Sequence, residues 1–579
     1  MAKIIAEKLV EADPQTKTEL EALKREIAKE LKIPYPNNIW LLSALSEGLA
    51  LRIRGLDPLK INRLRNLLRV RPVRSLSGIV NVSVLTKPYP CPGNCLYCPN
   101  EPGFPKSYLS GEPAAERAKL LKFNPHTQVK KRLENLAAEG HSIDKIELRI
   151  IGGTWSFYPK NYQDKFVASC FAACNALNIG KNPQYSKHCE KTKSLEREQK
   201  KNETAKCRIV GISVETRPDY INEKEIIQLR KLGVTRVELG IQSIYDDVLK
   251  LNNRGHKIDA AVRATKLLKN AGFKISYQIM LNLYGSNPKR DLAMAKELFA
   301  NPDFCPDLLK IYPCAVLPEA PLYEIYQQGK YRPYSDKKLI DVVKEIKKIV
   351  PPWVRIERII RDIPSPRITA GTKGISNLRQ IIAADMKREG WSCQCVRCRE
   401  IKGEYDPKEK IELVRRDYKA SNGTEIFLSF ENESKTKLFS LLRLRITNDG
   451  SNLITGNTGE NMVSPLRIEN DTMRANNHSP LQNTVAIVRE IHTYGLQTAI
   501  NQKSISAQHT GLGKKLIKEA EKIAREEFDT KKIAAISGVG ARAYWRKNGY
   551  KLQNTYMVKK LRERIRASAS SRLPAGGAF

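Results

Sequence analysis

Three closely spaced cysteines are the residues of this chain whose type and spacing most clearly point to chemistry. They form the stretch Cys91-Pro-Gly-Asn-Cys95-Leu-Tyr-Cys98, and a largely apolar run over 79–85 precedes them. Three thiolates at this spacing suit a [4Fe-4S] cluster in which one iron has no protein ligand. A zinc knuckle or a disulfide is the alternative for the same residues. The sequence therefore predicts an iron–sulfur site directly after a strand.

An iron without a protein ligand can hold S-adenosylmethionine (SAM) through its amino and carboxylate groups. Electron transfer from the cluster then yields a 5′-deoxyadenosyl radical. The CxxxCxxC spacing, with Tyr97 before the last cysteine, resembles the radical SAM superfamily. We expect further cofactor-binding groups at the carboxyl ends of the following strands, where parallel α/β folds bind ligands. The candidates are Gly152, Gly153, Thr154, Glu215, Arg217 and Gln242.

The elements that must position these residues alternate between short apolar runs and helical stretches, from residue 77 to about residue 386. The apolar runs include 145–151, 208–214, 235–241, 274–280 and 308–312. This alternation predicts an α/β fold with a parallel sheet that forms a partial (β/α) barrel. A Lys- and Glu-rich segment over 178–206 is predicted to be a solvent-exposed insertion.

A second glycine motif, Gln508-His-Thr-Gly511-Leu-Gly513-Lys514, opens a helix near the C-terminus. Glycines at this place expose backbone N–H groups to a pyrophosphate at the positive end of the helix. With the strands predicted over 486–494, 533–537 and 550–558, the motif resembles the acetyl-CoA site of GNAT acetyltransferases, which have an α+β fold. The implied acetyl-CoA contacts are Glu490, Ile491, His492, Gln508, His509, Thr510, Gly511, Leu512, Gly513 and Lys514.

A second cysteine group, Cys393-Gln-Cys395-Val-Arg-Cys398, follows the barrel region. The pair Cys395 and Cys398 has the spacing of half a zinc site, which needs ligands from elsewhere in the chain. Cys314, at the end of a predicted strand, is the candidate partner, and Cys393 could complete the set. Free thiols or a second iron–sulfur cluster are the alternatives to a structural zinc ion.

The net charge is +38, from 100 Lys and Arg against 62 Asp and Glu. Such an excess points to a polyanionic partner, since cations gain by displacing counterions from phosphates. A lysine-rich surface without such a partner is the plainer explanation. We expect tRNA to contact the N-terminal helical region at Arg52, Arg54, Lys60, Arg63, Arg65, Arg69, Arg71 and Arg74.

The length of 579 residues predicts about three domains. We divide the chain into a helical basic region (1–75), a radical SAM domain (76–390), a cysteine-rich zinc linker (391–411), an acetyltransferase domain (412–561) and a disordered basic tail (562–579). The sequence has no membrane span or signal peptide, which predicts a cytoplasmic protein that does not bind membranes. A homodimer remains open.

The combination of these two domains on one basic chain resembles the family of the catalytic subunit of Elongator, a tRNA-modifying acetyltransferase. The resemblance rests on the motifs over 86–91, 214–220, 240–245, 253–256, 350–353, 361–364, 412–418 and 536–540. The short spacing of the first cysteines suggests an archaeal or bacterial member, which would work without the other Elongator subunits.

The resemblance implies a reaction at the wobble uridine in the anticodon of tRNA. The radical would abstract hydrogen from the acetyl methyl group of acetyl-CoA, and addition to C5 of the uracil followed by thioester hydrolysis would give 5-carboxymethyluridine. Two departures from the family pattern stand out. The paired tyrosines of the family are Tyr544-Trp545 here, so that only Tyr544 is implied as a catalytic residue, and the stretch 280–285 lacks the expected prolines.

Two other functions fit parts of this pattern. A protein lysine acetyltransferase would use the acetyl-CoA site and keep the iron–sulfur cluster only as a structural element. A non-catalytic RNA-binding scaffold would need neither cofactor, and the intact motifs at 91–98 and 508–513 argue against it.

Overall fold

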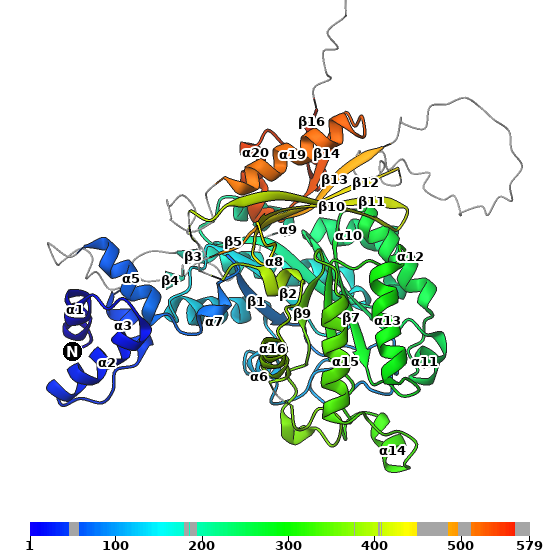
Figure 1. Ribbon diagram of the computed structural model, residues 1–579, viewed down its shortest axis with the longest axis horizontal. Coiled ribbons are helices and arrows are strands. Elements are labelled where there is room, and N and C mark those ends of the chain that lie inside the picture. Colours follow the sequence, from blue (N-terminus) through cyan, green and yellow to red (C-terminus); the bar gives the residue numbers. More distant parts are fainter. Residues whose placement is uncertain are drawn as a thin grey trace, which may run out of the picture.

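The computed structural model describes residues 1–45, 57–178, 184–185, 194–375, 377–402, 406, 408–448, 484–495 and 511–561. Two large sheets and an N-terminal group of helices make up these residues (Figure 1). Arg52, Arg54, Gln508, His509, Thr510 and the predicted tail over 562–579 lie outside the described residues. No described helix is long and apolar enough to cross a membrane.

The first sheet is parallel and its seven strands follow one another in chain order, β1-β2-β5-β6-β7-β8-β9. Its strands are β1 (Val80–Leu85), β2 (Lys145–Ile151), β5 (Arg208–Thr216), β6 (Arg236–Gln242), β7 (Lys274–Leu281), β8 (Leu308–Pro313) and β9 (Arg355–Arg358). Sequential order in a parallel sheet results from repeated strand–helix units, which curl the sheet into an open barrel. The predicted partial barrel is confirmed.

Helices cover the outer face of this barrel (Figure 1). They are α6 (Pro113–Leu120), α7 (Pro125–Ala138), α8 (Lys160–Ala176), α9 (Leu195–Asn202), α10 (Glu223–Leu232), α11 (Asp246–Leu251), α12 (Ile258–Asn270), α13 (Pro288–Ala300), α15 (Asp336–Ile349) and α16 (Leu378–Arg388). The short helix α14 (Leu322–Gln327) lies apart from this face, and its Leu322 belongs to a separate apolar cluster. In β1 the outward side chains of Val80, Val82 and Val84 are fully buried in the same apolar core as Val129 and Leu133 of α7. This burial holds the helices against the sheet.

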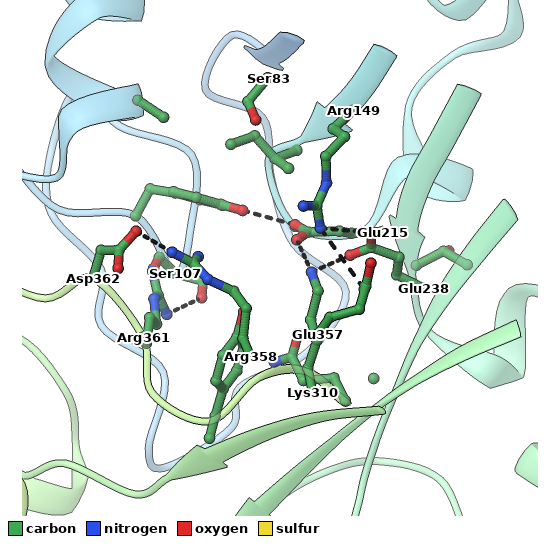
Figure 2. A pocket seen from close by; sticks show the side chains of 18 of the residues that line it. Ser83, Ser107, Arg149, Glu215, Glu238, Lys310, Glu357, Arg358, Arg361 and Asp362 are labelled. Carbon is green, nitrogen blue, oxygen red and sulfur yellow. Dashed lines mark hydrogen bonds and ion pairs between the residues drawn. The ribbon is translucent and has the colours of Figure 1, made fainter. Parts of the chain in front are cut away.

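The inner face of the barrel is polar, in contrast to its outer face (Figure 2). Arg149 donates to a carboxylate oxygen of Glu238 at 3.0 Å, and Lys310 forms an ion pair with the same carboxylate. Arg236 contacts Glu357 at 2.9 Å. Because these charges are buried, each needs its partner to offset the loss of hydration. The alternation of apolar and charged residues along the strands thus separates a packed outer face from a charged interior.

The second sheet has the order β10-β11-β12-β13-β14-β16-β15 and is mostly antiparallel, with one parallel pair, β13 and β14. Its elements are β10 (Ile411–Ala420), β11 (Gly423–Asn432), β12 (Leu438–Thr447), β13 (Val485–Thr493), β14 (Lys532–Ile536), β15 (Lys551–Gln553) and β16 (Tyr556–Lys560), with helices α19 (Leu512–Glu526) and α20 (Arg542–Lys547). The single strand predicted over 550–558 is wrong. Asn554, at φ +53°, turns the chain there and makes a hairpin.

The N-terminal helices have an apolar core of their own. They are α1 (Ala2–Ala12), α2 (Lys17–Glu30), α3 (Asn38–Ala44) and α5 (Pro58–Leu68), followed by the short helix η2 (Pro72–Arg74). Ile5, Leu20, Leu41 and Leu64 are buried together in this core. The amphipathic pattern of α5 therefore reflects packing within this unit.

The segment predicted to be an exposed insertion over 178–206 contains a packed helix. Leu195, Glu198, Gln199 and Asn202 of α9 are buried. Just after it, the carboxylate of Glu203 accepts hydrogen bonds from Arg542 at 3.1 Å and from Arg546 of α20 at 2.8 Å. The charges over residues 194–206 thus join the barrel to the second sheet. The expectation of a solvent-exposed insertion is wrong for this part of the segment.

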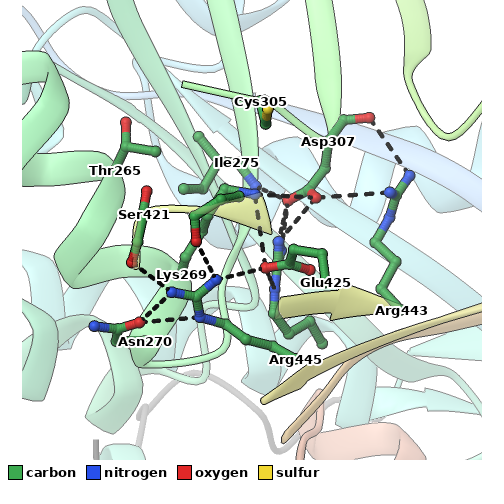
Figure 3. A network of polar contacts seen from close by, with 12 residues as sticks. Thr265, Lys269, Asn270, Ile275, Cys305, Asp307, Ser421, Glu425, Arg443 and Arg445 are labelled. Carbon is green, nitrogen blue, oxygen red and sulfur yellow. Dashed lines mark hydrogen bonds and ion pairs between the residues drawn. The ribbon is translucent and has the colours of Figure 1, made fainter. Parts of the chain in front are cut away.

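A buried ionic network joins the two sheets (Figure 3). Asp307, directly before β8, accepts three hydrogen bonds from the guanidinium of Arg489 on β13, at 2.7–2.8 Å, and both side chains are fully buried. Arg443 lies 3.6 Å and Lys269 lies 3.8 Å from the same carboxylate. Arg445 forms an ion pair with Glu425 at 2.9 Å. Its Nε also donates a hydrogen bond to Oδ1 of Asn270 at 2.9 Å.

Replacing Asp307 by Asn should leave Arg489 with Glu425, 3.4 Å away, as its remaining carboxylate partner. We expect a loss of about 3–5 kcal/mol in the free energy of unfolding, which is typical of a broken buried ion pair. Chemical denaturation, followed by fluorescence and circular dichroism, measures this loss. Asp303→Asn, at an exposed site four residues earlier, is the control. Equal midpoints for the two variants would contradict the importance of the pair.

Candidate active site

The predicted cluster cysteines lie in a loop that follows the carboxyl end of β1. The loop is fixed by the backbone N–H of Leu96, which donates to the carbonyl of Asn252 at 3.1 Å, and by Lys106, whose amine donates to the carbonyl of Gly93 at 2.7 Å. All three thiols line one cavity, and no described cysteine forms a disulfide. Cys91, Cys95 and Cys98 are free thiols in this structure.

The charges around the loop favour a thiolate at Cys95. Burial disfavours the charged form, but the Arg254 guanidinium, with Nη1 3.6 Å from Sγ, lowers the pKa of this thiol. Burial raises the pKa of Cys98 to about 12. Sequence reasoning missed Arg254, although it lies in the 253–256 motif that carries the family resemblance. A cluster whose iron ions compensate thiolate charge fits this donor set.

The predicted glycine motif lies beside the cluster loop. Gly152 has φ +141°, and a Cβ there would collide with the side chain of Thr86, so that only glycine fits. Thr154 follows, with its hydroxyl 4.0 Å from Cys91 Sγ. Gly153 and Thr154 also line the cavity of the cysteines. The structure therefore brings this motif and the cysteines together, as expected for parts of one site.

The other predicted SAM contacts end neighbouring strands and line the same cavity. Glu215 accepts a hydrogen bond from the Tyr108 hydroxyl at 2.7 Å, while Asp219 holds Arg217 at 2.8–3.3 Å. Within the described part of the chain, Arg217 Nη1 and Gln242 Oε1 are buried without a hydrogen-bond partner. Gln242 also has the unusual φ of +68°. A buried donor and acceptor left open at this place fit a polar, charged cofactor such as SAM.

The cavity that these residues line has a volume of about 560 Å³. It continues from the cluster loop into the charged interior of the barrel, where Figure 2 shows Glu215, Glu238, Lys310 and Glu357 pointing toward one another. Apart from Glu215, sequence reasoning missed these inward charges, although single charged residues alternating with apolar ones in the strand sequences were the available signal. Such an interior can hold a polar substrate next to the cluster loop.

The predicted acetyl-CoA helix, α19, starts after Gly511, which has φ +86°. No side chain among the described residues caps its first turn, so its N–H groups are available to bind an anion. A Cβ at Gly513 would come within 3.0 Å of the Tyr544 hydroxyl and 3.6 Å of Ile491, so this turn, Ile491 and Tyr544 surround one spot. The side chain of Leu512 is buried, so this residue can contact a ligand only through its backbone. The arrangement fits a pyrophosphate and its attached arm.

The acetyl-CoA candidates on β13 do not all face this helix. Glu490 points the other way, where it contacts Lys274 at 3.1 Å and Arg443 at 2.9 Å. The ring of His492 also lies on that side, with Nε2 2.7 Å from the carbonyl of Ser77. Alternation along the strand thus divides the side chains of residues 490–492 between two faces, and their contact with acetyl-CoA stays a prediction.

The second cysteine group differs from the predicted one. The sulfur atoms of Cys393, Cys395 and Cys398 lie within 4.8 Å of one another. Cys314 is instead buried in a separate apolar cluster with Leu283 and Tyr331, and its role as a metal ligand is corrected. The third thiol of the group comes from Cys393, which lies two residues before Cys395 in the chain, and not from Cys314. Neighbouring thiols lower the pKa of Cys395 well below its usual value, which favours metal binding.

The predicted RNA-binding residues of the N-terminal region are partly engaged in contacts within the protein. Arg63 pairs with Asp13 at 2.6 Å, Lys60 lies 3.9 Å from the same carboxylate, and Arg65 donates to the carbonyl of Leu45. Arg69 donates to the carbonyl of Gly140 at 3.0 Å. Arg74 forms an ion pair with Glu139. Arg71 is exposed, and no partner for its side chain is found in the described ranges. The basic stretch thus both anchors the helices and offers charge to solvent.

Comparisons with known proteins found two family models, several similar proteins and a similar structure. Residues 89–298 match the radical SAM superfamily and residues 306–388 match the radical SAM C-terminal domain. The chain is 43% identical to the tRNA uridine(34) acetyltransferase of Methanocaldococcus infernus over 86% of this chain and 88% of that protein. It is 38% identical to human Elongator complex protein 3, over 86% of each. The structure of M. infernus Elp3 with an N-terminal deletion matches with a TM-score of 0.67 and 41% identity, covering 84% of this chain and all of that one.

Exchange of single cysteines distinguishes the observed thiol group from the predicted one. Cys393→Ser should lower the zinc content of the purified protein, because it removes one of three neighbouring thiolates. Cys314→Ser should leave it unchanged, although both thiols are buried. Elemental analysis with iron as an internal reference measures both. Equal zinc loss in the two variants would contradict the observed grouping.

Proposed function

Because this chain belongs to the family of tRNA uridine(34) acetyltransferases and Elongator complex protein 3, we propose that it modifies the wobble uridine of tRNA by radical SAM chemistry. One observation carries the proposal beyond family membership. A single cavity is lined by the cysteines of the first domain and by Glu490, His492 and Tyr494 of the second. A site shared in this way suits a reaction that combines a radical with an acyl donor.

The proposed product is 5-carboxymethyluridine, and each part of the site has a role in forming it. Cys91, Cys95 and Cys98 hold a [4Fe-4S] cluster, which with SAM supplies a carbon radical for abstraction of hydrogen from the acetyl group of acetyl-CoA. Arg217 and Gln242 orient SAM through the polar atoms that they leave open. The first turn of α19 binds the pyrophosphate of acetyl-CoA, and Tyr544 contacts the arm next to it.

The partner in this proposal is tRNA. The protein would act on it in the cytoplasm and without other Elongator subunits. The excess of positive charge supports an RNA partner, since the chain carries a net charge of +38. Arg71 is the member of the basic stretch best placed to meet a phosphate, because it is exposed and its neighbours Arg69 and Arg74 are engaged within the protein. A structural zinc ion at Cys393, Cys395 and Cys398 completes the proposed set of cofactors.

The function is tested by anaerobic incubation of reconstituted protein with SAM, acetyl-CoA, a reductant and tRNA, followed by mass spectrometry of nucleosides. We expect 5-carboxymethyluridine from the wild type and none from Cys95→Ala. Gly511→Glu should still cleave SAM but lose the product, because it places a strained, negative residue at the pyrophosphate site.

Gly329→Glu is the matched control for the glycine variant, since Gly329 also has a positive φ and open space around it. It should keep both activities. A protein lysine acetyltransferase would instead acetylate a lysine peptide equally well with and without Cys95. That result, together with unmodified tRNA, would contradict the proposal.

The contribution of Arg71 to RNA binding is measurable by salt dependence. Arg71→Gln should weaken binding of all tRNAs alike and reduce the slope of log affinity against log salt by about 0.7–0.9, which is the value for one lost phosphate contact. Filter-binding titrations at several salt concentrations give this slope. Lys224→Gln, an exposed change on α10, is the control. An unchanged slope for Arg71→Gln would remove this residue from the RNA-binding surface.

A further inference from the structure

Strand β7 carries a polar side chain on its inner face that the site described above does not use. From Ile275 to Leu281, every second residue of the strand is buried in the apolar core of the outer face. The residues that alternate with them therefore face the interior of the barrel. These inward residues are Lys274, Ser276, Gln278 and Met280.

Gln278 is the polar member of this group that is open to a ligand. Lys274 forms an ion pair with Glu490 at 3.1 Å, and the Ser276 hydroxyl donates to Glu357 at 3.3 Å. Gln278 is half-buried and lines the cavity, and its amide has no hydrogen-bond partner among the residues that the structure describes. A glutamine amide offers both N–H donors and a carbonyl acceptor. The cavity therefore contains an unused donor and acceptor side by side.

The position of Gln278 along the strand places it near the cluster loop. Met280, two residues further along β7, packs in one apolar group with Leu96 and Tyr97 of that loop. Two residues of a strand span about 7 Å, so that Gln278 lies roughly this far below the level of the loop. A ligand bound by the amide would be held inside the barrel and close to the cysteines.

The neighbouring strand β6 brings Gln278 close to the predicted SAM contacts. Gly240 is its register partner on that strand. A Cβ on Gly240 would come 2.8 Å from Nε2 of Gln242 and 3.1 Å from Nη2 of Arg254, so these two side chains reach over the glycine. Gln242 is the residue proposed above to orient SAM. A group held by Gln278 would accordingly lie beside bound SAM.

The polar groups around Gln278 favour a neutral ligand. Lys310, its register partner on β8, already forms an ion pair with Glu238. Asn81 and Ser83 on β1 line the same cavity, and no partner for either neutral side chain is found in the described ranges. Burial of an ion is costly where the countercharges are already paired, whereas a neutral polar group needs only hydrogen bonds. This part of the interior therefore suits an uncharged ligand with donors and acceptors of its own.

Uracil is a ligand of this kind. Its N3–H group is a donor, and a carbonyl oxygen flanks it on each side. One glutamine amide can accept from N3–H and donate to one of these carbonyls at the same time. These contacts use the edge of the ring at N3 and leave C5 free to react. Unstacked bases of RNA loops are commonly bound through this Watson–Crick edge.

We infer that Gln278 binds the uracil base of the wobble nucleotide through N3–H and an adjacent carbonyl, and that it is a specificity-determining residue of the reaction. The inference rests on the proposed function and adds to it a residue that recognises the base. A buried amide that finds no partner is costly, so a base without the N3–H donor is a poorer ligand.

The contact is tested by changing the protein and the RNA together. A wobble uridine that is methylated at N3 cannot donate from this atom. For anaerobically reconstituted wild-type protein with SAM, this methylation should weaken binding of an anticodon stem–loop RNA about tenfold. Gln278→Met keeps the length of the side chain but lacks the amide, and the same methylation should then change the affinity by less than about twofold. Filter-binding titrations give the four affinities.

Asn81→Leu is the matched control, because it removes another amide that lines the same cavity. It should keep the tenfold effect of methylation. Gln278→Asn, which withdraws the amide by one methylene group, is a second variant that should lose the effect. Circular dichroism shows whether each variant is folded.

An equal effect of methylation in the wild type and in both Gln278 variants would overturn the role of Gln278. No effect in the wild type would overturn recognition of the base at this edge. Neither result concerns the product, which nucleoside mass spectrometry measures separately. A wild-type protein that binds the RNA but forms no 5-carboxymethyluridine would instead overturn the proposed function.

Discussion

The buried pair of Asp307 and Arg489 is the interaction on which the arrangement of the two sheets depends. Asp307 also accepts the backbone N–H of Ile275 at 2.9 Å, so one carboxylate fixes the start of β7, the start of β8 and strand β13. Buried charges of this kind add little net stability, because desolvation offsets much of their attraction. Their value is in specificity: an alternative packing of the two domains would bury the same charges without partners.

This constraint explains why the two domains share one interior. The apolar core of the barrel continues into the second sheet, where it includes Ile487, Ile536 and Tyr556. With the ionic network beside it, this shared core holds β13 against the amino-terminal ends of the barrel strands. The position of β13 in turn places the first turn of α19 and the interior of the barrel on opposite faces of one strand. Packing between domains therefore determines which groups can meet.

Much of this architecture could be predicted from the sequence, because hydrophobic runs and spaced motifs are local signals. The strand at 145–151 agrees with the structure residue by residue, and the barrel class was predicted correctly. What depends on distant contacts could not be predicted. The burial of Cys314 in a separate apolar cluster depends on the fold, and the direction of Glu490 needed the partner Lys274. The hairpin at Asn554 was missed, since a single Asn among polar residues is a weak turn signal.

The charged interior of the barrel has a consequence for how this protein can change over evolutionary time. Arg149, Arg236 and Lys310 share the carboxylates of Glu238 and Glu357. Loss of one member unbalances the buried charges of the set, and a broken buried pair costs about 3–5 kcal/mol, whereas replacement of a whole set by apolar residues can be neutral. Single substitutions inside the barrel should therefore destabilise the protein, even where a double substitution would be harmless. Sequence drift along these strands should be confined to the outward positions, and the inner surface should change only by joint replacement of several residues.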